Sequence, residues 1–195
     1  DVPVPNDYDG DLRTDTAVWR GGGAAGSQAY FYVFQSFSNT VRITPFGLFG
    51  DNPNATQDFD GDFRADYTVT RKENGKLIWY VLLSATGTLH VQHFGNETDK
   101  AVRGDYDGDF RADLAVYRPA TDSPANTFFV LRSSNDTLQA VNFGLSDIDK
   151  IVPGDYNGDN TTDFAVWRST TGDWYWTTGG GVNVVHFGQS GDLPV

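Results

Sequence analysis

Acidic residues recur at fixed spacing in four short segments of this 195-residue chain. In each segment, oxygen-bearing side chains stand at positions 1, 3, 5 and 9 of a nine-residue stretch, with glycine at position 4. The segments are Asp7-Tyr-Asp-Gly-Asp-Leu-Arg-Thr-Asp15, Asp58-Phe-Asp-Gly-Asp-Phe-Arg-Ala-Asp66, Asp105-Tyr-Asp-Gly-Asp-Phe-Arg-Ala-Asp113 and Asp155-Tyr-Asn-Gly-Asp-Asn-Thr-Thr-Asp163. Alternating carboxylates in a tight loop can converge on one cation, and hard oxygen donors favour calcium over softer metals. Magnesium fits less well because it retains several waters.

The backbone carbonyl at position 7 is the natural fifth ligand of such a loop. It belongs to Arg13, Arg64, Arg111 and Thr161. The pattern differs from an EF-hand, which has glycine at position 6 and glutamate at position 12. An ordinary acidic turn is the alternative, since Asp-Gly is a common turn pair. Because the terminal aspartate is kept in all four copies, we favour cation binding, with about one calcium ion per repeat.

The spacing of the acidic segments also predicts the fold. They start 51, 47 and 50 residues apart, and a period of this size is typical of propellers, solenoids and arrays. Each is followed by an apolar run, then by an aromatic and β-branched run, and then by a run that ends in Phe-Gly. The Phe-Gly pairs are Phe46-Gly47, Phe94-Gly95, Phe143-Gly144 and Phe187-Gly188. We therefore predict an all-β chain, a single four-bladed β-propeller domain over residues 1–195 with three- to four-stranded antiparallel blades.

The sequence also bears on the overall architecture and on the order of the strands in each blade. A pair of β-sandwiches is the rival architecture, but it does not predict the same loop at the same place in every unit. The apolar runs at 16–20, 67–71, 114–118 and 164–168 are continuous, as expected of strands covered on both faces, so we expect them to be the innermost strands. Short segments such as 100–102 and 150–152 follow Phe-Gly, and we assign them as fourth strands.

The motif residues resemble the FG-GAP/VCBS repeat family. The resemblance rests on Asp-x-Asp-Gly-Asp-x-x-x-Asp, on the Ala-Val-Trp-Arg type of strand after it, on the closing Phe-Gly and on Val152-Pro-Gly-Asp155, and it covers nearly the whole chain. It implies an extracellular β-propeller with structural calcium ions, as in the integrin α-subunit head. Carried over by position, the metal ligands are Asp7, Asp9, Asp11 and Asp15; Asp58, Asp60, Asp62 and Asp66; Asp105, Asp107, Asp109 and Asp113; and Asp155, Asn157, Asp159 and Asp163.

The chain departs from the family pattern in two ways. Many members have glycine at position 6, where this chain has Leu12, Phe63, Phe110 and Asn160. If position 6 needs a left-handed backbone, a bulky residue there costs about 1 kcal/mol of strain. Such a cost would favour a loop with a different backbone conformation. Asn157 also replaces one carboxylate, which predicts a weaker fourth site.

Composition limits the classes of partner. The net charge is −12 and the isoelectric point near 4.4, which argues against nucleic acid and anionic membrane surfaces. Of the 26 acidic residues, 15 lie in the four loops, and four divalent ions would bring the charge to roughly −4. No apolar run approaches the length of a membrane span. The chain has no Cys and no Met, and its first residues suggest processing or excision from a longer chain, so we expect a secreted, extracellular or cell-surface protein. Sequons at Asn54, Asn96, Asn135 and Asn160 favour a glycoprotein.

The first and last residues repeat one another. Asp1-Val-Pro-Val4 and Asp192-Leu-Pro-Val195 correspond to the same place in the repeat as Asp99 to Val102. A closed ring needs one such segment, so the other is spare. It can fray, pair with a neighbouring subunit by strand addition into an oligomer or filament, or show that the chain belongs to a longer array.

Recurrent arginines and the absence of catalytic motifs bear on the remaining functional hypotheses. An arginine stands at the end of each apolar run: Arg20, Arg71, Arg118 and Arg168. These arginines could form a ligand-binding ring, but we favour a structural role in which each pairs with an acidic loop or stacks on an aromatic ring. No nucleophile or phosphate-binding motif is present, so we do not expect an enzyme. The hypotheses are a structural or adhesive module, a carbohydrate-binding propeller that uses aromatics such as Trp174 and Trp176, and a non-catalytic fragment of a polysaccharide-degrading enzyme.

Overall fold

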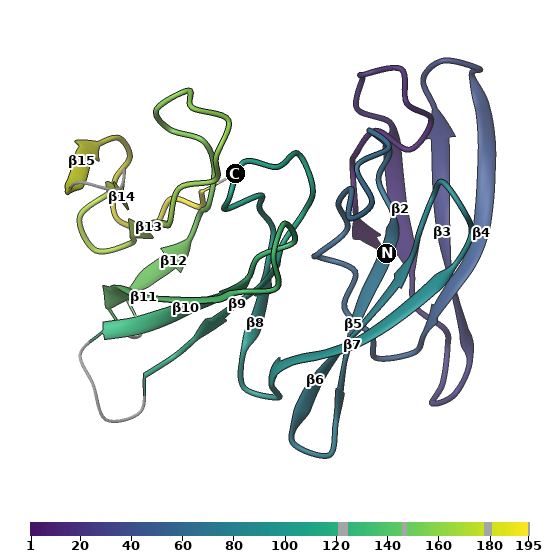
Figure 1. Cartoon of the computed structure of the whole chain (residues 1–195), viewed down its shortest axis with the longest axis horizontal. Coiled ribbons are helices and arrows are strands. Elements are labelled where there is room, and N and C mark those ends of the chain that lie inside the picture. Colours follow the sequence, from purple (N-terminus) through teal and green to yellow (C-terminus); the bar gives the residue numbers. More distant parts are fainter. Residues whose placement is uncertain (121–124, 146–147, 178–180, 195) are drawn as a thin grey trace. The chain divides into compact units, whose positions relative to one another are not determined.

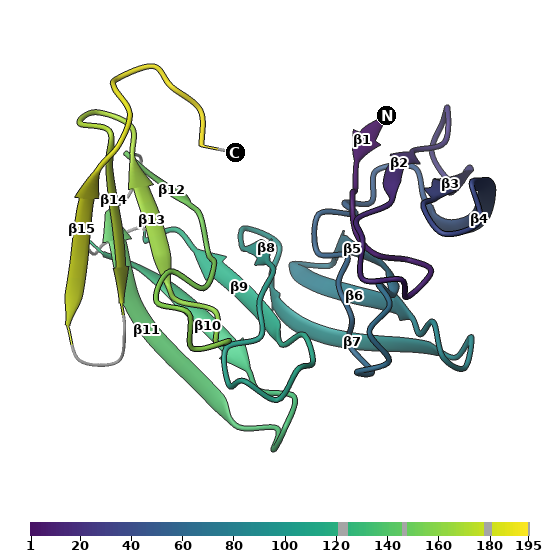
Figure 2. The same cartoon turned by 90° about the horizontal axis from the view of Figure 1, so that it is seen from above.

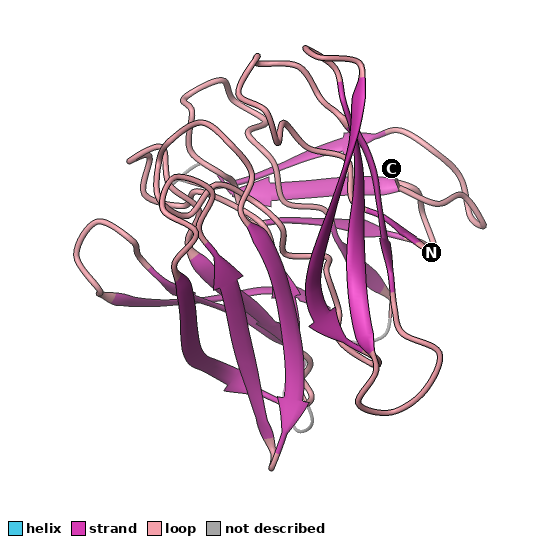
Figure 3. Ribbon diagram, turned by 90° about the vertical axis from the view of Figure 1, so that its right-hand side faces the viewer, coloured by secondary structure: helices cyan, strands magenta, loops and turns pink. Residues whose placement is uncertain are grey.

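The structure, a computed structural model, describes residues 1–120, 125–145, 148–177 and 181–194. In these residues it contains strands, turns and loops but no helix, so no helix in this part of the chain could cross a membrane (Figure 3). Four antiparallel sheets of three or four strands are formed, one for each repeat. The predicted all-β, four-bladed β-propeller fold is confirmed.

The strands follow the same order in each sheet (Figure 1). The first sheet contains β1 (Val2–Pro3), β2 (Thr16–Arg20), β3 (Gln28–Gln35) and β4 (Thr40–Leu48). The second contains β5 (Tyr67–Glu73), β6 (Lys76–Leu82) and β7 (Leu89–Asn96). The third contains β8 (Lys100–Val102), β9 (Leu114–Arg118), β10 (Ala125–Leu131) and β11 (Leu138–Leu145). The fourth contains β12 (Asp149–Ile151), β13 (Ala165–Arg168), β14 (Asp173–Thr177) and β15 (Val182–His186), which Figure 2 shows side by side.

The chain divides into two compact units. Asp1–Glu97 holds the first and second sheets, and Thr98–Val195 holds the third and fourth. Each unit has its own apolar core: Phe31 and Val69 are fully buried in the first, and Phe128 and Val166 are buried in the second. The single domain over residues 1–195 stays a prediction.

The strand order corrects one sequence assignment. The apolar runs after the acidic loops were expected at the inner edge, but β2, β9 and β13 are second in their sheets. The edge position belongs to the short segments β1, β8 and β12, which pair with the strands that follow them through Val2↔Trp19, Lys100↔Tyr117 and Lys150↔Trp167. A short segment is therefore the first strand of the next sheet, not the fourth strand of the preceding unit. In the second sheet, a single bridge, Asn52↔Thr70, takes its place.

Burial explains why this order is stable. The strands β5, β9 and β13 are covered on both faces, as their continuous apolar sequences predicted. The same prediction is wrong for 16–20, because only alternate residues of β2 are buried. The last strands, β4, β7 and β15, are largely exposed sheet edges. Each acidic loop connects the short first segment to the buried second strand of the same sheet. The loops are thus fixed at both ends by paired backbone.

Candidate metal centre

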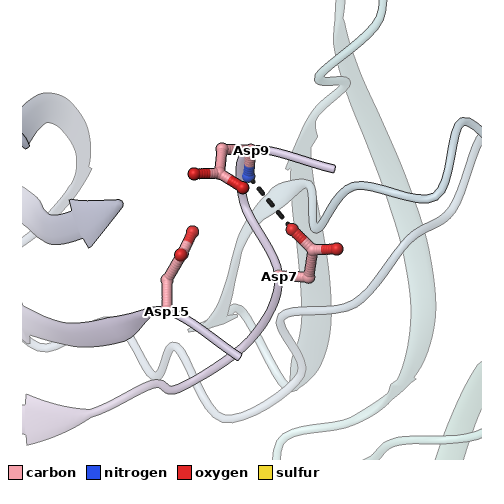
Figure 4. Close-up of side chains that lie close together, drawn as sticks. All are labelled: Asp7, Asp9 and Asp15. Carbon is pink, nitrogen blue, oxygen red and sulfur yellow. Dashed lines mark hydrogen bonds between the residues drawn. The ribbon is translucent and has the colours of Figure 1, made fainter. Parts of the chain in front are cut away.

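The first acidic loop brings three of its predicted ligands together. One carboxylate oxygen from each of Asp7, Asp9 and Asp15 lies within 4.8 Å of the others, and Figure 4 shows the three side chains facing one another. Asp15 is fully buried, whereas Asp7 and Asp9 are half-buried. A buried group of like charges is costly unless a cation balances it.

Comparable trios form in the next two loops. They consist of Asp58, Asp60 and Asp62, and of Asp105, Asp107 and Asp113. Within the described residues the fourth loop forms no trio. There Asn157 stands where a carboxylate stands in the other loops, and its Nδ2 donates a hydrogen bond to Asp159 Oδ2 at 3.0 Å. The lower affinity of this loop stays a prediction.

The aspartate at position 1 shapes each loop. Asp7 Oδ1 accepts from the Gly10 amide at 2.6 Å, and Asp7 Oδ2 accepts from the Leu12 amide at 2.7 Å. The same two bonds recur on Asp58, Asp105 and Asp155. Because the carboxylate holds the loop's own backbone, the turn is preformed by the sequence.

The aspartate at position 9 ties the loop to a hairpin of its own sheet. Asp113 Oδ2 accepts from the Tyr106 amide and Oδ1 from the Ser133 amide, both at 2.7 Å. Asp15 and Asp66 make equivalent bonds, to Ser36 and Ser84 on the hairpin side. The buried carboxylate therefore has both oxygens satisfied by backbone amides.

Sequence reasoning missed the hairpin serines. Their hydroxyls donate to the carboxylate at position 5: Ser36 Oγ to Asp11 at 2.9 Å, Ser84 Oγ to Asp62 at 2.7 Å and Ser133 Oγ to Asp109 at 2.9 Å. The signal was present, because a serine follows the aromatic strand in the first three repeats. It went unused because serine in a turn is common and carries no metal signature.

Two oxygens at position 3 point to a ligand. Asp60 Oδ2 and Asp107 Oδ1 are buried, and among the residues that the structure describes neither has a hydrogen-bond partner. A buried carboxylate oxygen without a partner costs free energy, and a bound cation is one of the few groups that would satisfy it. Both oxygens belong to aspartates of the trios, so these two loops fit a cation.

Burial also disfavours the charged state of the position 9 carboxyls when no ion is present. Burial, with a smaller contribution from the neighbouring loop carboxylates, raises the pKa of Asp66 and of Asp113 to about 6, although hydrogen bonds from backbone amides lower it. The pKa of Asp163 in the fourth loop is raised for the same reason. A divalent ion would reverse this preference by stabilising the ionised form.

Position 6 adopts a left-handed backbone in every loop. Its φ is 64° at Leu12, 64° at Phe63, 66° at Phe110 and 64° at Asn160. The loop therefore keeps the conformation that favours glycine, although bulky residues occupy it. The side chains of Leu12, Phe63 and Phe110 are mostly exposed, so nothing crowds them.

At position 7, the structure shows the hydrogen bonds of the backbone amides. The amides of Arg13, Arg64, Arg111 and Thr161 donate to the position 5 carboxylate of their own loop at 2.8 to 2.9 Å. This bond closes the turn. Their carbonyls as fifth ligands stay a prediction.

The recurrent arginines are braces. Each makes a two-bond ion pair with an aspartate and lies 4.4 to 4.9 Å from an aromatic ring centre on the neighbouring strand. The pairs are Arg20 with Asp1, Arg71 with Asp51, Arg118 with Asp99 and Arg168 with Asp149. The expected stacking is confirmed, but the expected acidic-loop partner is wrong. The aspartate comes from the short segment before the loop, which runs beside the arginine's strand.

The comparisons with known proteins add no relative. The chain matches no protein-family model, no curated protein and no solved structure. The resemblance to FG-GAP/VCBS repeats therefore rests on the motif residues alone.

Proposed function

We propose that this chain is a calcium-stabilised structural or adhesive β-propeller module of the FG-GAP/VCBS type, secreted or displayed at a cell surface and without enzymatic activity. The observation that carries the proposal is the buried, unpartnered oxygen of Asp60 and of Asp107 inside a cluster of carboxylates. Calcium suits these loops because it accepts many carboxylate and carbonyl oxygens in flexible geometry.

The ion would act through the residues that already shape the loop. The position 9 carboxylate joins the loop to the hairpin, and the position 1 carboxylate joins it to its own backbone. When bound, calcium would supply the positive charge that lets these carboxylates stay ionised while buried. Each loop would then be fixed relative to its sheet, which is a structural role.

Contacts inside a unit also tie neighbouring loops. The Ala65 amide donates to the Asp7 carbonyl at 2.6 Å, and the Thr162 amide donates to the Asp105 carbonyl at 2.6 Å. An ion in one loop would therefore also order its neighbour in the same unit. This supports a role in holding blades together.

The carbohydrate-binding alternative has less support. Trp174 Nε1 donates to the Phe187 carbonyl at 2.8 Å, and the Trp176 ring stacks on Tyr156 with 5.4 Å between ring centres. Both side chains are half-buried, so part of each ring already serves internal packing. A cavity of about 500 Å³ in the second unit is lined by Tyr106 and Phe164, but these rings are themselves mostly buried.

Thermal unfolding tests the proposal. The chain is freed of metal with a chelator, and its melting temperature is followed as calcium or magnesium is added. We expect calcium to raise it, because an ion that binds only the folded state stabilises that state by mass action. We expect a smaller effect of magnesium.

A matched pair of variants locates the effect. Asp107→Asn removes the unpartnered oxygen of the third loop, and Asp136→Asn makes the same change on an exposed turn. The calcium-dependent rise should shrink in the first variant and persist in the second. A melting curve that calcium leaves unmoved would overturn the proposal.

A further inference from the structure

The two sheets of each unit meet around the same pair of aromatic rings. Tyr8 stacks on Tyr67 in the first unit, with 5.4 Å between ring centres, and Tyr106 stacks on Phe164 in the second unit, with 4.9 Å. In each unit a phenylalanine of the first of its two sheets meets the second ring edge-on. Because this pair of rings is shared, the residues that cover it can be compared between the units.

In the first unit, an arginine covers the second ring. Arg42 of β4 lies opposite Val33 in the sheet, and its Cζ lies 6.0 Å from the centre of the Tyr67 ring. A guanidinium over an aromatic face is attracted by the electrons of the ring. Leu82, which pairs with Tyr67 across the second sheet, packs against the core of the unit. The first unit therefore fills this place with a cation and an aliphatic side chain of its own.

In the second unit, shorter and uncharged side chains stand at the same positions. Gln139 of β11 corresponds to Arg42, since each lies opposite the equivalent valine of its sheet, and Thr177 of β14 corresponds to Leu82. Arg132 Nη2 donates to Gln139 Oε1 at 2.9 Å, which fixes the glutamine amide. A cavity of about 500 Å³, lined by Gln139 and Thr177, lies here.

The wall of this cavity is acidic. Among the residues that the structure describes, the lining includes Asp159 and Asp163 but no Lys, Arg or His. Thr161, another lining residue, stands where the first unit has Arg64, so a second guanidinium is replaced as well. Arg132 hydrogen-bonds to Gln139 and forms no ion pair with either carboxylate within the described part of the chain. The cavity therefore favours a positively charged ligand.

One carboxylate on the wall is buried and has an oxygen without a partner. Asp163 is 6% exposed, and its Oδ2 accepts from the Tyr156 amide at 3.0 Å. In the first three loops the other oxygen at this position accepts from a hairpin amide. Asp163 Oδ1 has no such partner among the described residues. A buried acceptor without a donor costs free energy, and a charged donor would satisfy it best.

We propose that this cavity binds the arginine side chain of a partner protein. The guanidinium takes the place that Arg42 fills in the first unit, against the Phe164 ring, and donates to Asp163 Oδ1. Thr161 and Thr177 also line the cavity, and their hydroxyls accept further hydrogen bonds. A guanidinium suits such a site because it is planar, always charged and carries five N–H donors. The inference concerns recognition of a partner, so it goes beyond the proposed structural role of calcium.

A nuclear magnetic resonance titration with acetyl-arginine amide tests the site. The isotope-labelled chain is titrated in calcium and again in chelator, because calcium in the fourth loop would offset the charge of Asp163. We expect the amide signals of Thr161 and Thr177 to shift in at least one buffer. Acetyl-citrulline amide has a similar shape but no charge, and it should bind about tenfold more weakly or less. No shift in either buffer, or equal binding of both probes, overturns the proposal.

Two variants fill the cavity with the side chains of the first unit. Gln139→Arg supplies the guanidinium that Arg42 supplies there, and Thr177→Leu copies Leu82 without a change of charge. Each should weaken binding of acetyl-arginine amide about tenfold or more. Gln92→Arg makes the same charge change on the exposed strand β7 and should leave binding unchanged.

The variants also separate this proposal from the calcium sites. Neither Gln139 nor Thr177 lies in an acidic loop, so the calcium-dependent rise in melting temperature should persist in both variants. If a folded filling variant binds the probe as well as the natural chain does, or if Gln92→Arg weakens binding equally, the arginine does not occupy this cavity. Because the two filling variants differ in charge and size, one still tests the site if the other folds poorly.

Discussion

The first three acidic loops and the fourth share one backbone but differ in how much charge they hold. All four have a left-handed residue at position 6, and all four have a position 1 carboxylate that accepts two loop amides. Among the residues that the structure describes, only the first three loops gather three carboxylates, and the fourth has Asn157 in place of one of them. Loop shape is therefore set by hydrogen bonds that the fourth loop keeps, and we propose that cation affinity depends on the carboxylate that it lacks.

The largest effect should come from the buried carboxylates at position 9. In Asp113→Ala, the Tyr106 and Ser133 amides lose their acceptor inside the protein, so we expect a loss of about 3 kcal/mol in the free energy of unfolding. The fourth-loop change Asp163→Ala should cost about 1 kcal/mol, because its carboxylate is less buried. Denaturant unfolding in chelator measures both. Equal losses would show that the position 9 carboxylates of the third and fourth loops contribute equally to stability.

The next effect is the pH dependence of stability, which should reverse when calcium binds. The folded-state pKa of Asp66 and Asp113 is about 6, above the ordinary value of 3.8. The metal-free folded chain therefore binds protons more tightly than the unfolded chain, and this contribution is complete below pH 4 and lost as pH rises through 6. We expect the metal-free chain to gain about 2 kcal/mol from pH 7 to pH 5.

The calcium-loaded chain should show the opposite slope. Calcium ligands must be ionised, so acidification releases the ion and removes its stabilisation. Melting curves at matched pH with calcium and with chelator separate the two cases. Parallel slopes would contradict the assignment of these carboxylates as ligands. Replacing both with asparagine should flatten the metal-free slope, whereas Asp163→Asn should change it less.

The blades and the carboxylate positions could be predicted from sequence because both repeat at a fixed period. The register of the short segments could not, since two or three residues such as Val2–Pro3 carry no strand periodicity of their own. Their place follows from a side-chain pair, Arg20 with Asp1, that spans 19 residues of sequence. Had the aspartates six or seven residues before each loop been aligned with the arginines after it, the pairing would have been predictable.

The backbone conformation of position 6 could not be predicted from sequence, for a physical reason. Leu12, Phe63 and Phe110 all disfavour a left-handed backbone, so sequence alone predicts either strain or a different turn. The structure shows strain, because two amides held by the position 1 carboxylate fix the backbone of the loop. Several hydrogen bonds thus outweigh one residue's conformational preference.

A single substitution should make the fourth loop behave like the others. Asn157→Asp restores the missing carboxylate and removes the Asn157 to Asp159 hydrogen bond. In chelator, repulsion among carboxylates should lower the melting temperature. In calcium, the affinity of this loop should rise about tenfold, which corresponds to about 1.4 kcal/mol. Calorimetric titration measures the change, and the reverse substitution Asp107→Asn is the matched control. If neither variant alters calcium binding, charge count does not distinguish the loops.

The smallest effect concerns the strain at position 6. Glycine adopts a left-handed backbone without a steric penalty, and the exposed side chains of Leu12, Phe63 and Phe110 make few contacts to lose. Leu12→Gly, Phe63→Gly and Phe110→Gly should each stabilise the fold by about 1 kcal/mol. Asn160→Gly should gain less, because asparagine tolerates this conformation better than other residues with a Cβ. Denaturant unfolding of the four variants checks the order. A loss of stability in Phe63→Gly or Phe110→Gly would contradict this prediction. It would mean that the exposed ring contributes more to the stability of the fold than the left-handed backbone at position 6 costs.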